Sequence, residues 1–375
     1  MPPWRHVVVP VRGGRGRRRG RGLHRRGPAR RAAAAAAAAR RRGRDRPPAG
    51  AGGRGRASRA GAGRHLAAEP APADTTAAEP APADTRAAEP PPPPPPKAAR
   101  AATSPLDDVL DGDDAAGVTF VAWPEQRTVD DEAWGPVLTD VARHLATTEI
   151  DPYWQGGTDD SGRATDGHEG THGIQYRLRN YGGKLAGFTG RDHVNGFYVL
   201  RDRAVILLEP PVSKTEVGPR VPASLRGHRY DLYIAHQEGW NDRPLYVLDE
   251  WSAYCNGAAV DIDRAQRGLT HRGFVVTDAI MGPLEFGVYA IAVVRAVAEV
   301  APDYLRDHPE LAAFVAWNLR RAMGLYRLGR AITELAWTDA DTYLDALRTG
   351  DDAADLRGFV RDTWGEAWAR DVLGF

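Results

Sequence analysis

The sequence has almost no cysteine, and this limits its chemistry. Its single thiol, Cys255, cannot form an intramolecular disulfide, and a zinc cluster built from several thiolates is also excluded. A lone thiol of this kind is usually a small apolar residue in a protein core, and we expect the same of Cys255. A metal site in this chain would therefore depend on histidine and carboxylate ligands.

Long apolar runs are also missing. No uninterrupted run reaches the ~20 residues that a helix needs to cross a membrane. The best candidate, residues 279–300, is interrupted by Pro283, Glu285 and Arg295. We predict a buried helix there and no transmembrane segment.

The first 105 residues lack apolar side chains that could form a core. Residues 1–65 are mostly Arg, Gly and Ala, which predicts a disordered basic tail. Residues 66–105 are a Pro/Ala-rich repeat, in which 67–75 recurs as 77–85, and this is typical of an extended, disordered linker. Residues 1–105 carry 23 Lys and Arg against 6 Asp and Glu, whereas the remainder carries 27 against 43. The near-neutral total is therefore the sum of a basic tail and an acidic folded part.

The arginine-rich tail indicates a non-specific anionic surface as a partner. It has no aromatic residue after Trp4 on which bases could stack, so we expect no specific nucleic-acid binding. Three alternatives stay open: a solvated tail without a partner, an overextended gene start, and function through nucleic-acid binding by the tail. Arg30 and Arg31 before an alanine run also resemble a twin-arginine signal. The proline-rich spacer slightly favours a secreted or cell-envelope protein over a cytoplasmic one.

Residues 106–375 predict one α+β domain with a small mixed sheet followed by a mainly helical C-terminal part. We expect folded structure from about Gly117. The predicted strands are 118–122 and a hairpin of 195–200 and 204–209. Asp166 is the expected N-cap of a helix that ends near residue 180, at Gly182–Gly183. The other predicted helices are 130–148, much of 223–235, one starting near Pro244 with Asn241 or Asp242 as its cap, 283–300, 309–335, 339–347 and 352–372.

The strongest chemical signal is the motif His168-Glu169-x-x-His172. Residues four apart lie on one face of a helix, so His168 and His172 can direct two imidazole nitrogens at one metal ion. Glu169 can then reach a metal-activated water and act as a general base. The alternative is that these residues occupy the solvated face of a surface helix.

A catalytic zinc site needs a third protein ligand. A metzincin continuation would require Gly at position 175 and His at position 178, but the chain has Gln175 and Leu178. Glu250 is the best-placed alternative, because it lies on a predicted helix with Tyr246 and Tyr254 on the same face. Asp249 points about 100° away from Glu250, so only one of the two can face the metal. The remaining competitors are His193, Glu209, His228, His236 and Glu238.

This combination, the His168–His172 motif followed by a helical Glu250, resembles the gluzincin branch of zinc metallopeptidases, the thermolysin and lethal-factor type. The resemblance implies a zincin-like fold, Zn²⁺ held by His168, His172 and Glu250, and Glu169 as the general base. It also implies that the hairpin at 195–209 supplies an edge strand for extended peptides. Thermolysin-like enzymes have an aspartate four residues after the glutamate, where this chain has Tyr254. The Tyr254 phenol is a candidate catalytic group that would hydrogen-bond a ligand or polarise a carbonyl; the alternative is that Tyr254 is a core residue.

The sequence therefore predicts a zinc-dependent metallopeptidase that hydrolyses peptide or protein substrates. The competing prediction is a non-catalytic helical module that binds a metal structurally, or binds none, and is tethered by the disordered tail.

Overall fold

The computed structural model describes residues 104–112, 115–149, 153–154, 156–190, 192–271, 279–336 and 338–375. The chain divides into two units, 1–95 and 96–375, and every described residue belongs to the second. The predicted tail (1–65) and the predicted linker up to residue 103 lie outside the described residues. The described part is mainly helical with one three-stranded sheet, which confirms the α+β class. Both strand pairs of this sheet are antiparallel, so the prediction of a mixed sheet is wrong for the described residues.

Folded structure begins earlier than the sequence indicated. Helix α1 (Pro105–Asp111) precedes Gly117, where we expected the fold to start. The Ser104 hydroxyl accepts a hydrogen bond from the Asp107 backbone N–H (3.1 Å), and the Asp107 carboxylate accepts one from the Ser104 N–H (2.9 Å). This reciprocal cap supplies partners for two backbone donors at the helix start.

The next two elements are shorter than predicted. Strand β1 comprises only Val121–Ala122, and helix α2 spans Pro136–His144 rather than 130–148. Gly135 explains the late start of α2, because its φ of 81° is left-handed and cannot continue a right-handed helix. The short helix η1 (Thr147–Glu149) follows α2.

Helix α4 (Asp160–Arg177) carries the histidine motif, and its predicted N-cap is wrong. Asp159 caps the helix by accepting the backbone N–H of Gly162 at 2.8 Å. Asp166 instead lies inside the helix and is buried. Its carboxylate accepts the backbone N–H groups of Gly156 and Gly157 at 3.0 and 3.1 Å, so it fixes the loop before the helix.

The helical segment extends beyond its predicted end, because Gly182 and Gly183 lie inside it and do not terminate it. A π-helical turn, η2 (Leu178–Gly182), and a short helix, η3 (Gly183–Ala186), continue α4. Gly187 then ends the segment with a φ of 81°, which is a common helix termination.

The predicted hairpin is confirmed. Strands β2 (Val194–Tyr198) and β3 (Arg203–Leu208) pair antiparallel, and β1 pairs with the other edge of β3. Between β2 and β3, residues 200–202 all have positive φ (70°, 57° and 57°) although none is glycine.

Short helical turns connect the sheet to the second long helix. They are α5 (Lys214–Val217), η4 (Gly218–Arg220), η5 (Ala223–Leu225) and the π-helical η6 (Tyr230–His236). The mixed, helical character predicted for 223–235 is confirmed.

Helix α6 (Tyr246–Gln266) starts close to the predicted position but has a different cap. Neither Asn241 nor Asp242 caps it; the Glu209 carboxylate, at the end of the hairpin, accepts the backbone N–H of Leu245 at 3.1 Å. Burial raises the pKa of Glu209 to about 7. A cap that comes from a distant strand cannot be recognised in the local sequence.

The C-terminal part is helical, as predicted. Two predicted helices are interrupted: the one at 309–335 ends at Gly329, and the last is broken at Gly365, which has a φ of 92°. The elements are α7 (Met281–Val300), α8 (Pro302–Asp307), α9 (Glu310–Gly329), α10 (Thr338–Thr349), η7 (Asp351–Ala353), α11 (Ala354–Trp364) and α12 (Glu366–Val372). Helix α7 has the length and hydropathy to cross a membrane, but 83% of its most apolar window is buried inside the fold.

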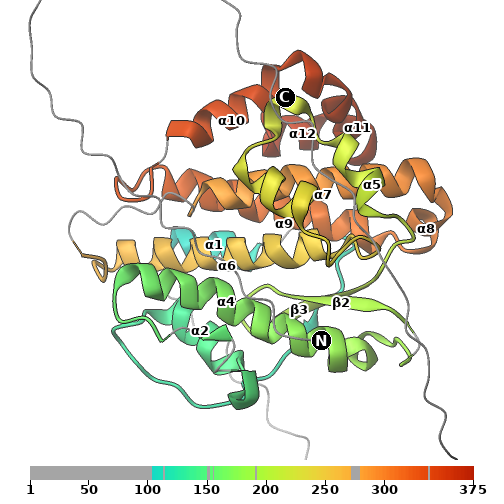
Figure 1. The fold of residues 1–375 in the computed structure, drawn as a ribbon. Coiled ribbons are helices and arrows are strands. Elements are labelled where there is room, and N and C mark those ends of the chain that lie inside the picture. The colour runs from blue at the N-terminus through green and yellow to red at the C-terminus, as the bar shows by residue number, and fades with distance from the viewer. Residues whose placement is uncertain are drawn as a thin grey trace, which may run out of the picture. The chain divides into compact units, whose positions relative to one another are not determined.

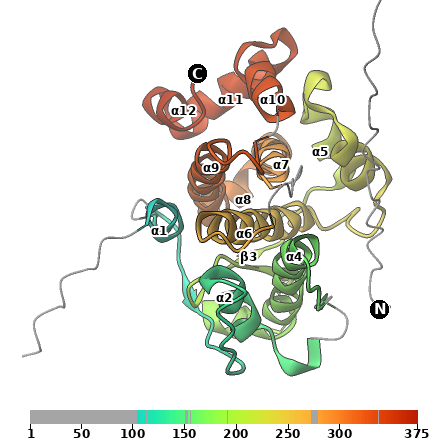
Figure 2. The same ribbon diagram turned by 90° about the vertical axis from the view of Figure 1, so that its left-hand side faces the viewer.

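The helices and the sheet form layers around α6. Figures 1 and 2 show α4 and the sheet on one side of α6, and α7 and α9 on the other. Helices α10, α11 and α12 cover the outer side of α7 and α9. The helix with the histidine motif, α4, therefore packs directly on the central helix α6. Cys255 on α6 is buried, as predicted.

Candidate metal centre

Helices α4 and α6 pack most closely at Gly167. A Cβ atom there would lie 2.8 Å from the Val260 side chain, closer than real Cβ contacts, whereas a Cβ at Gly257 would make an ordinary contact of 3.5 Å with the His168 Cβ. The helices run antiparallel, since the later part of α4 contacts the early part of α6. Close packing of the backbones brings side chains of moderate length on the two helices into direct contact.

The structure brings His168, His172 and Glu250 together at this interface. The Nε2 atoms of the two histidines are 3.2 Å apart. Glu250 Oε2 lies 3.4 Å from His172 Nε2 and 3.7 Å from His168 Nε2. Three donor atoms from two helices therefore converge on one point.

The separations of these atoms fit a small divalent ion. Zinc holds imidazole nitrogen and carboxylate oxygen at about 2.0–2.2 Å, and tetrahedral angles then place the donor atoms about 3.3–3.6 Å apart. The three observed distances span this range. Two neutral imidazoles and a carboxylate are also the chemical set that zinc prefers when thiolates are absent.

The motif does not lie on a solvated helix face. The side chain of His172 is 7% exposed and that of Glu250 is fully buried, while His168 is 16% exposed. Glu169 follows His168 on α4 and is also buried. The alternative of a solvated face therefore does not hold, and His168 is the most exposed of the three candidate ligands.

Glu250 is oriented by a phenol. The Tyr246 hydroxyl donates a hydrogen bond to Glu250 Oε1 at 2.7 Å, and the Gln237 amide donates to that hydroxyl at 3.2 Å. These contacts fix one carboxylate oxygen and direct the other toward the histidine pair. The sequence contained a signal for this contact, because Tyr246 and Glu250 are one helical turn apart.

Asp249 holds the outer side of His172. Its Oδ1 atom lies 2.6 Å from His172 Nδ1, and the Gln175 amide donates to the same oxygen at 3.1 Å. Arg179 Nη1 lies 3.6 Å from the other oxygen. A carboxylate on one ring nitrogen fixes the tautomer and leaves the other nitrogen available to a metal. Adjacent residues on α6 thus contact opposite sides of one imidazole, a role for Asp249 that the sequence analysis did not identify.

The charge around His172 favours a bound cation. Burial opposes the charged imidazole, but the nearby Glu250 and Asp249 carboxylates outweigh it and raise the pKa of His172 well above its usual range. The pocket between these carboxylates therefore attracts positive charge, either a proton or a metal ion.

Tyr254 packs against the centre by its ring. Its ring lies edge-on to the His168 ring, with centroids 4.5 Å apart, and its hydroxyl is 3.2 Å from the Tyr233 hydroxyl. The Arg229 guanidinium lies over the Tyr254 ring at 5.3 Å and pairs with the buried Glu285. These contacts build one wall of the centre from α6, α7 and η6.

The competing ligands lie elsewhere. His193, His228, His236 and Glu238 are exposed, and none belongs to the convergent group. Glu209 is occupied as the cap of α6. The hairpin was expected to supply an edge strand that pairs with an extended peptide. Strand β2 is at the edge of the sheet, but four of its five residues are buried, so a peptide cannot pair with it in this conformation.

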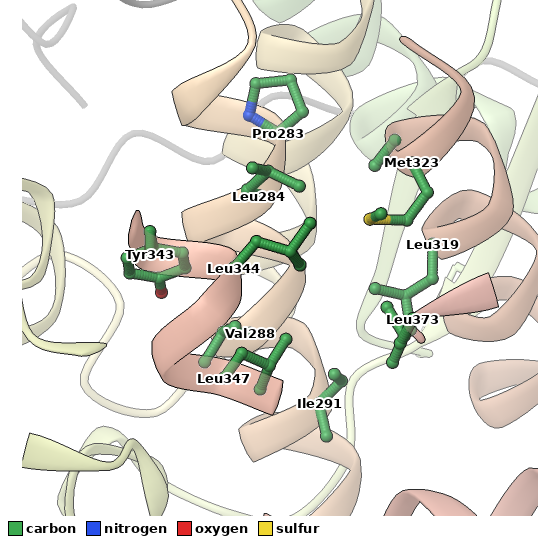
Figure 3. Close-up of a pocket in the computed structure, with 12 residues that line it drawn as sticks. Pro283, Leu284, Val288, Ile291, Leu319, Met323, Tyr343, Leu344, Leu347 and Leu373 are labelled. Atoms are coloured by element: carbon green, nitrogen blue, oxygen red, sulfur yellow. The ribbon is translucent and has the colours of Figure 1, made fainter. Parts of the chain in front are cut away.

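Two cavities in the described residues lie away from this centre. One, of about 10 Å³, lies among apolar side chains of α7, α9, α10 and the C-terminus, including Leu284, Leu319 and Leu344 (Figure 3). Its volume is at the lower limit for one water molecule, so it is a small packing defect between apolar side chains and not a binding pocket. The other, of about 220 Å³, lies between α1, α2, α6 and the hairpin turn.

Comparisons of the chain with known protein families, with characterised proteins and with solved structures find no match.

Proposed function

We propose that the chain is a zinc-dependent hydrolase of the metallopeptidase type. One observation carries the proposal: the donor atoms of His168, His172 and Glu250 converge from two helices at separations of 3.2, 3.4 and 3.7 Å. These separations are close to the ~3.3–3.6 Å expected between ligands on one tetrahedral ion. The arrangement of a motif-bearing helix, a small sheet beside it and a later helix that brings the glutamate supports a zincin-like architecture.

Each residue of the centre has a role in this proposal. A zinc ion held by His168, His172 and Glu250 would supply Lewis-acid chemistry, activating water and polarising a carbonyl group. Glu169 accepts the proton of the attacking water and passes it to the leaving amine. Tyr254, as a catalytic phenol, would donate toward the carbonyl oxygen after release from Tyr233.

Neighbouring side chains keep these groups in place. Tyr246 holds one oxygen of Glu250, and Asp249 holds the outer nitrogen of His172. The substrate in this proposal is a peptide or protein segment that reaches the centre from the side of His168, the most exposed ligand. Because β2 is buried, pairing of the substrate with this strand would require its cover to move.

Two substitutions test the proposal together. Glu250→Ala removes a ligand and should lower zinc content after dialysis. Glu169→Gln keeps the shape and both imidazoles, so it should retain zinc and lose about 10²–10⁴ in rate, the usual contribution of a general base. Zinc content by elemental analysis and hydrolysis of a mixed peptide library are the two measurements.

Glu238→Gln is a matched control, because Glu238 is exposed and lies outside the convergent group. It should leave zinc content and hydrolysis unchanged. Equal zinc content in the wild type and Glu250→Ala would remove Glu250 from the centre. Absence of zinc from every variant and from the wild type would refute the metal site itself.

A structural metal site is the second candidate. The observation that favours it is the complete burial of Glu250, together with the 7% exposure of His172. Structural zinc sites are closed, whereas catalytic sites keep a position open for water. If the site is structural, zinc removal should unfold the chain, and Glu169→Gln should change neither metal content nor any hydrolysis.

A further inference from the structure

Large hydrophobic side chains are exposed at five positions in the described residues, and three of these follow one another at the end of the helix that carries the histidine motif. They are Tyr176 on α4 (39% exposed), Tyr181 in η2 (66%) and Leu185 in η3 (53%). The other two, Leu232 and Val300, belong to separate elements, η6 and α7. Single exposed hydrophobic residues are ordinary, but a group of them on one continuous segment is typical of an interaction site.

Cationic side chains accompany these hydrophobic residues. The Arg177 guanidinium lies over the Tyr181 ring at 5.6 Å, and the Arg179 guanidinium lies over the Tyr176 ring at 5.9 Å. Residues 170–191 contain four Lys and Arg and no Asp or Glu, although residues 106–375 as a whole are acidic. The aromatic–cationic surface, as we call it, consists of Tyr176, Arg177, Arg179, Tyr181, Lys184 and Leu185.

This surface adjoins the candidate metal centre. Arg179 Nη1 lies 3.6 Å from Asp249 Oδ2, and the other oxygen of Asp249 lies 2.6 Å from His172 Nδ1. One side chain, Asp249, therefore separates the surface from a candidate ligand. Tyr176 is one turn after His172 on α4, and the nine residues from His172 to Tyr181 correspond to about 13 Å of helix. An extended peptide covers this length with about four residues, so a peptide on the surface can also reach the centre.

The charges of the molecule favour an acidic peptide as the occupant of this surface. The cations attract carboxylates, while the rings and Leu185 offer contacts to apolar side chains. The first 105 residues of this chain are themselves basic, so the surface repels them. A nucleic acid has a negative charge on every phosphate and would bring some of them close to the buried carboxylates Glu169, Asp249 and Glu250. A peptide can place its acidic residues on the surface and neutral residues at the centre.

We propose that the aromatic–cationic surface binds acidic peptide segments that also carry aromatic or aliphatic side chains. That these segments are substrates rests on the proposed function, which gives the neighbouring centre its hydrolytic role. The surface follows His172 along α4 and lies on one side of the histidine pair. The acidic residues of a substrate should therefore all lie on one side of the cleaved bond.

The first test measures binding, which does not depend on hydrolysis. The full-length chain with Glu169→Gln, which keeps the peptide intact, is titrated into a fluorescent peptide of alternating Glu and Leu, and anisotropy is recorded. The same peptide with Lys in place of Glu should bind more weakly. Tyr181→Ala/Lys184→Glu removes one exposed ring and reverses one exposed charge, and it should weaken binding of the Glu peptide about tenfold.

Val300→Ala/Arg370→Glu is the matched control. It also shortens one exposed hydrophobic side chain and reverses one exposed cation, but in α7 and α12, away from the surface. The basic tail is the same in both double variants, so its own attraction for the peptide cancels in the comparison. The control should bind like its parent, and both double variants should keep the parent's Tm because the changed side chains are exposed.

Several outcomes would overturn the proposal. Equal binding of the Glu and Lys peptides, or equal loss in the surface variant and the control, would remove the surface as a peptide site. Tighter binding of a single-stranded oligonucleotide or of anionic lipid vesicles, lost in Tyr181→Ala/Lys184→Glu, would assign the surface to that partner. Dimerisation lost in the same variant, measured by sedimentation, would assign it to a second copy of this chain.

Hydrolysis by the chain with Glu169 intact separates this proposal from the proposed function. If the Glu peptide binds as expected but no peptide is cleaved, the surface stands and the hydrolase does not. If a mixed peptide library is cleaved without a preference for acidic residues on one side of the bond, the hydrolase stands and the surface does not select its substrate.

Discussion

His172 lies between two carboxylates, and this predicts how metal binding depends on pH. A metal needs the neutral imidazole, but the Glu250 and Asp249 carboxylates raise the pKa of His172 well above its usual value near 6.5. Below that raised pKa each zinc ion must displace a proton, so zinc affinity should rise about tenfold per pH unit and level off above it. Competition with a metal-sensitive chelator dye between about pH 6 and pH 9 measures the profile.

Asp249→Asn is the informative variant for this profile. Loss of one carboxylate lowers the His172 pKa, so the affinity should level off at a lower pH than in the wild type. The plateau itself should be about 10–100-fold weaker, because the ring loses the carboxylate that orients it. If the variant reaches the wild-type zinc affinity at high pH, Asp249 acts only through its charge and does not orient the ring.

The convergence of the candidate ligands could be predicted in part from local geometry, but the contacts that orient them could not. The four-residue spacing places His168 and His172 on one helix face whatever the rest of the chain does. Likewise, the angle between Asp249 and Glu250 allows only one of the two to face both histidine Nε2 atoms, and in the structure this is Glu250. The contact of Asp249 with the other nitrogen of His172 depends on how α4 and α6 align, and the sequence does not state this.

At the scale of the helix, the glycines of α4 are explained by packing. A glycine inside a helix costs about 1 kcal/mol relative to alanine. The structure shows that a Cβ at Gly173 would lie 2.4 Å from Leu145 Cδ1, and one at Gly170 would lie 2.9 Å from Val141 Cγ1. The two glycines allow α2 to pack closely against the helix that bears the His168–His172 motif.

This packing predicts opposite effects for two similar substitutions. Gly173→Ala should lower the free energy of unfolding by about 1–3 kcal/mol, the usual cost of overpacking, despite the better helix propensity of alanine. Gly358→Ala is the matched control in helix α11, where no atom lies within 4 Å of the added Cβ. It should raise the free energy of unfolding by about 0.5–1 kcal/mol. Urea denaturation measures both, and stabilisation by Gly173→Ala would contradict the close packing.

Element types were predicted better than element boundaries, for a common physical reason. The hairpin and the C-terminal helices follow from apolar periodicity, which each segment carries in its own sequence. The ends depend on caps. Asp166 has the residue type of an N-cap but accepts hydrogen bonds from a preceding loop, and α6 is capped by Glu209 from a distant strand. Such partners become known only when the chain has folded.

At the scale of the whole chain, the charge difference between the two parts of the sequence matches the limit of the described fold. The acidic part contains the layered core around α6, and the basic part precedes residue 104. We expected folded structure from about Gly117, but two leucines of α1 lie in the core. Those two leucines, Leu106 and Leu110, are 2% and 1% exposed in the structure.

Two truncations test where the folding unit begins. A chain that starts at Ser104 keeps the described core and the cap of α1, so its Tm should equal that of the full-length chain. A chain that starts at Gly117 loses the burial of Leu106 and Leu110, which is worth about 3–6 kcal/mol at the usual value for leucine. It also loses the pairs that Asp107 and Asp111 form with Arg201, and its Tm should fall sharply.

Limited proteolysis of the full-length chain should likewise leave a fragment that starts at or shortly before Ser104. Equal stability of both truncations would mean that α1 is not part of the core, and a lower Tm for the chain starting at Ser104 would mean that the basic part contributes to folding.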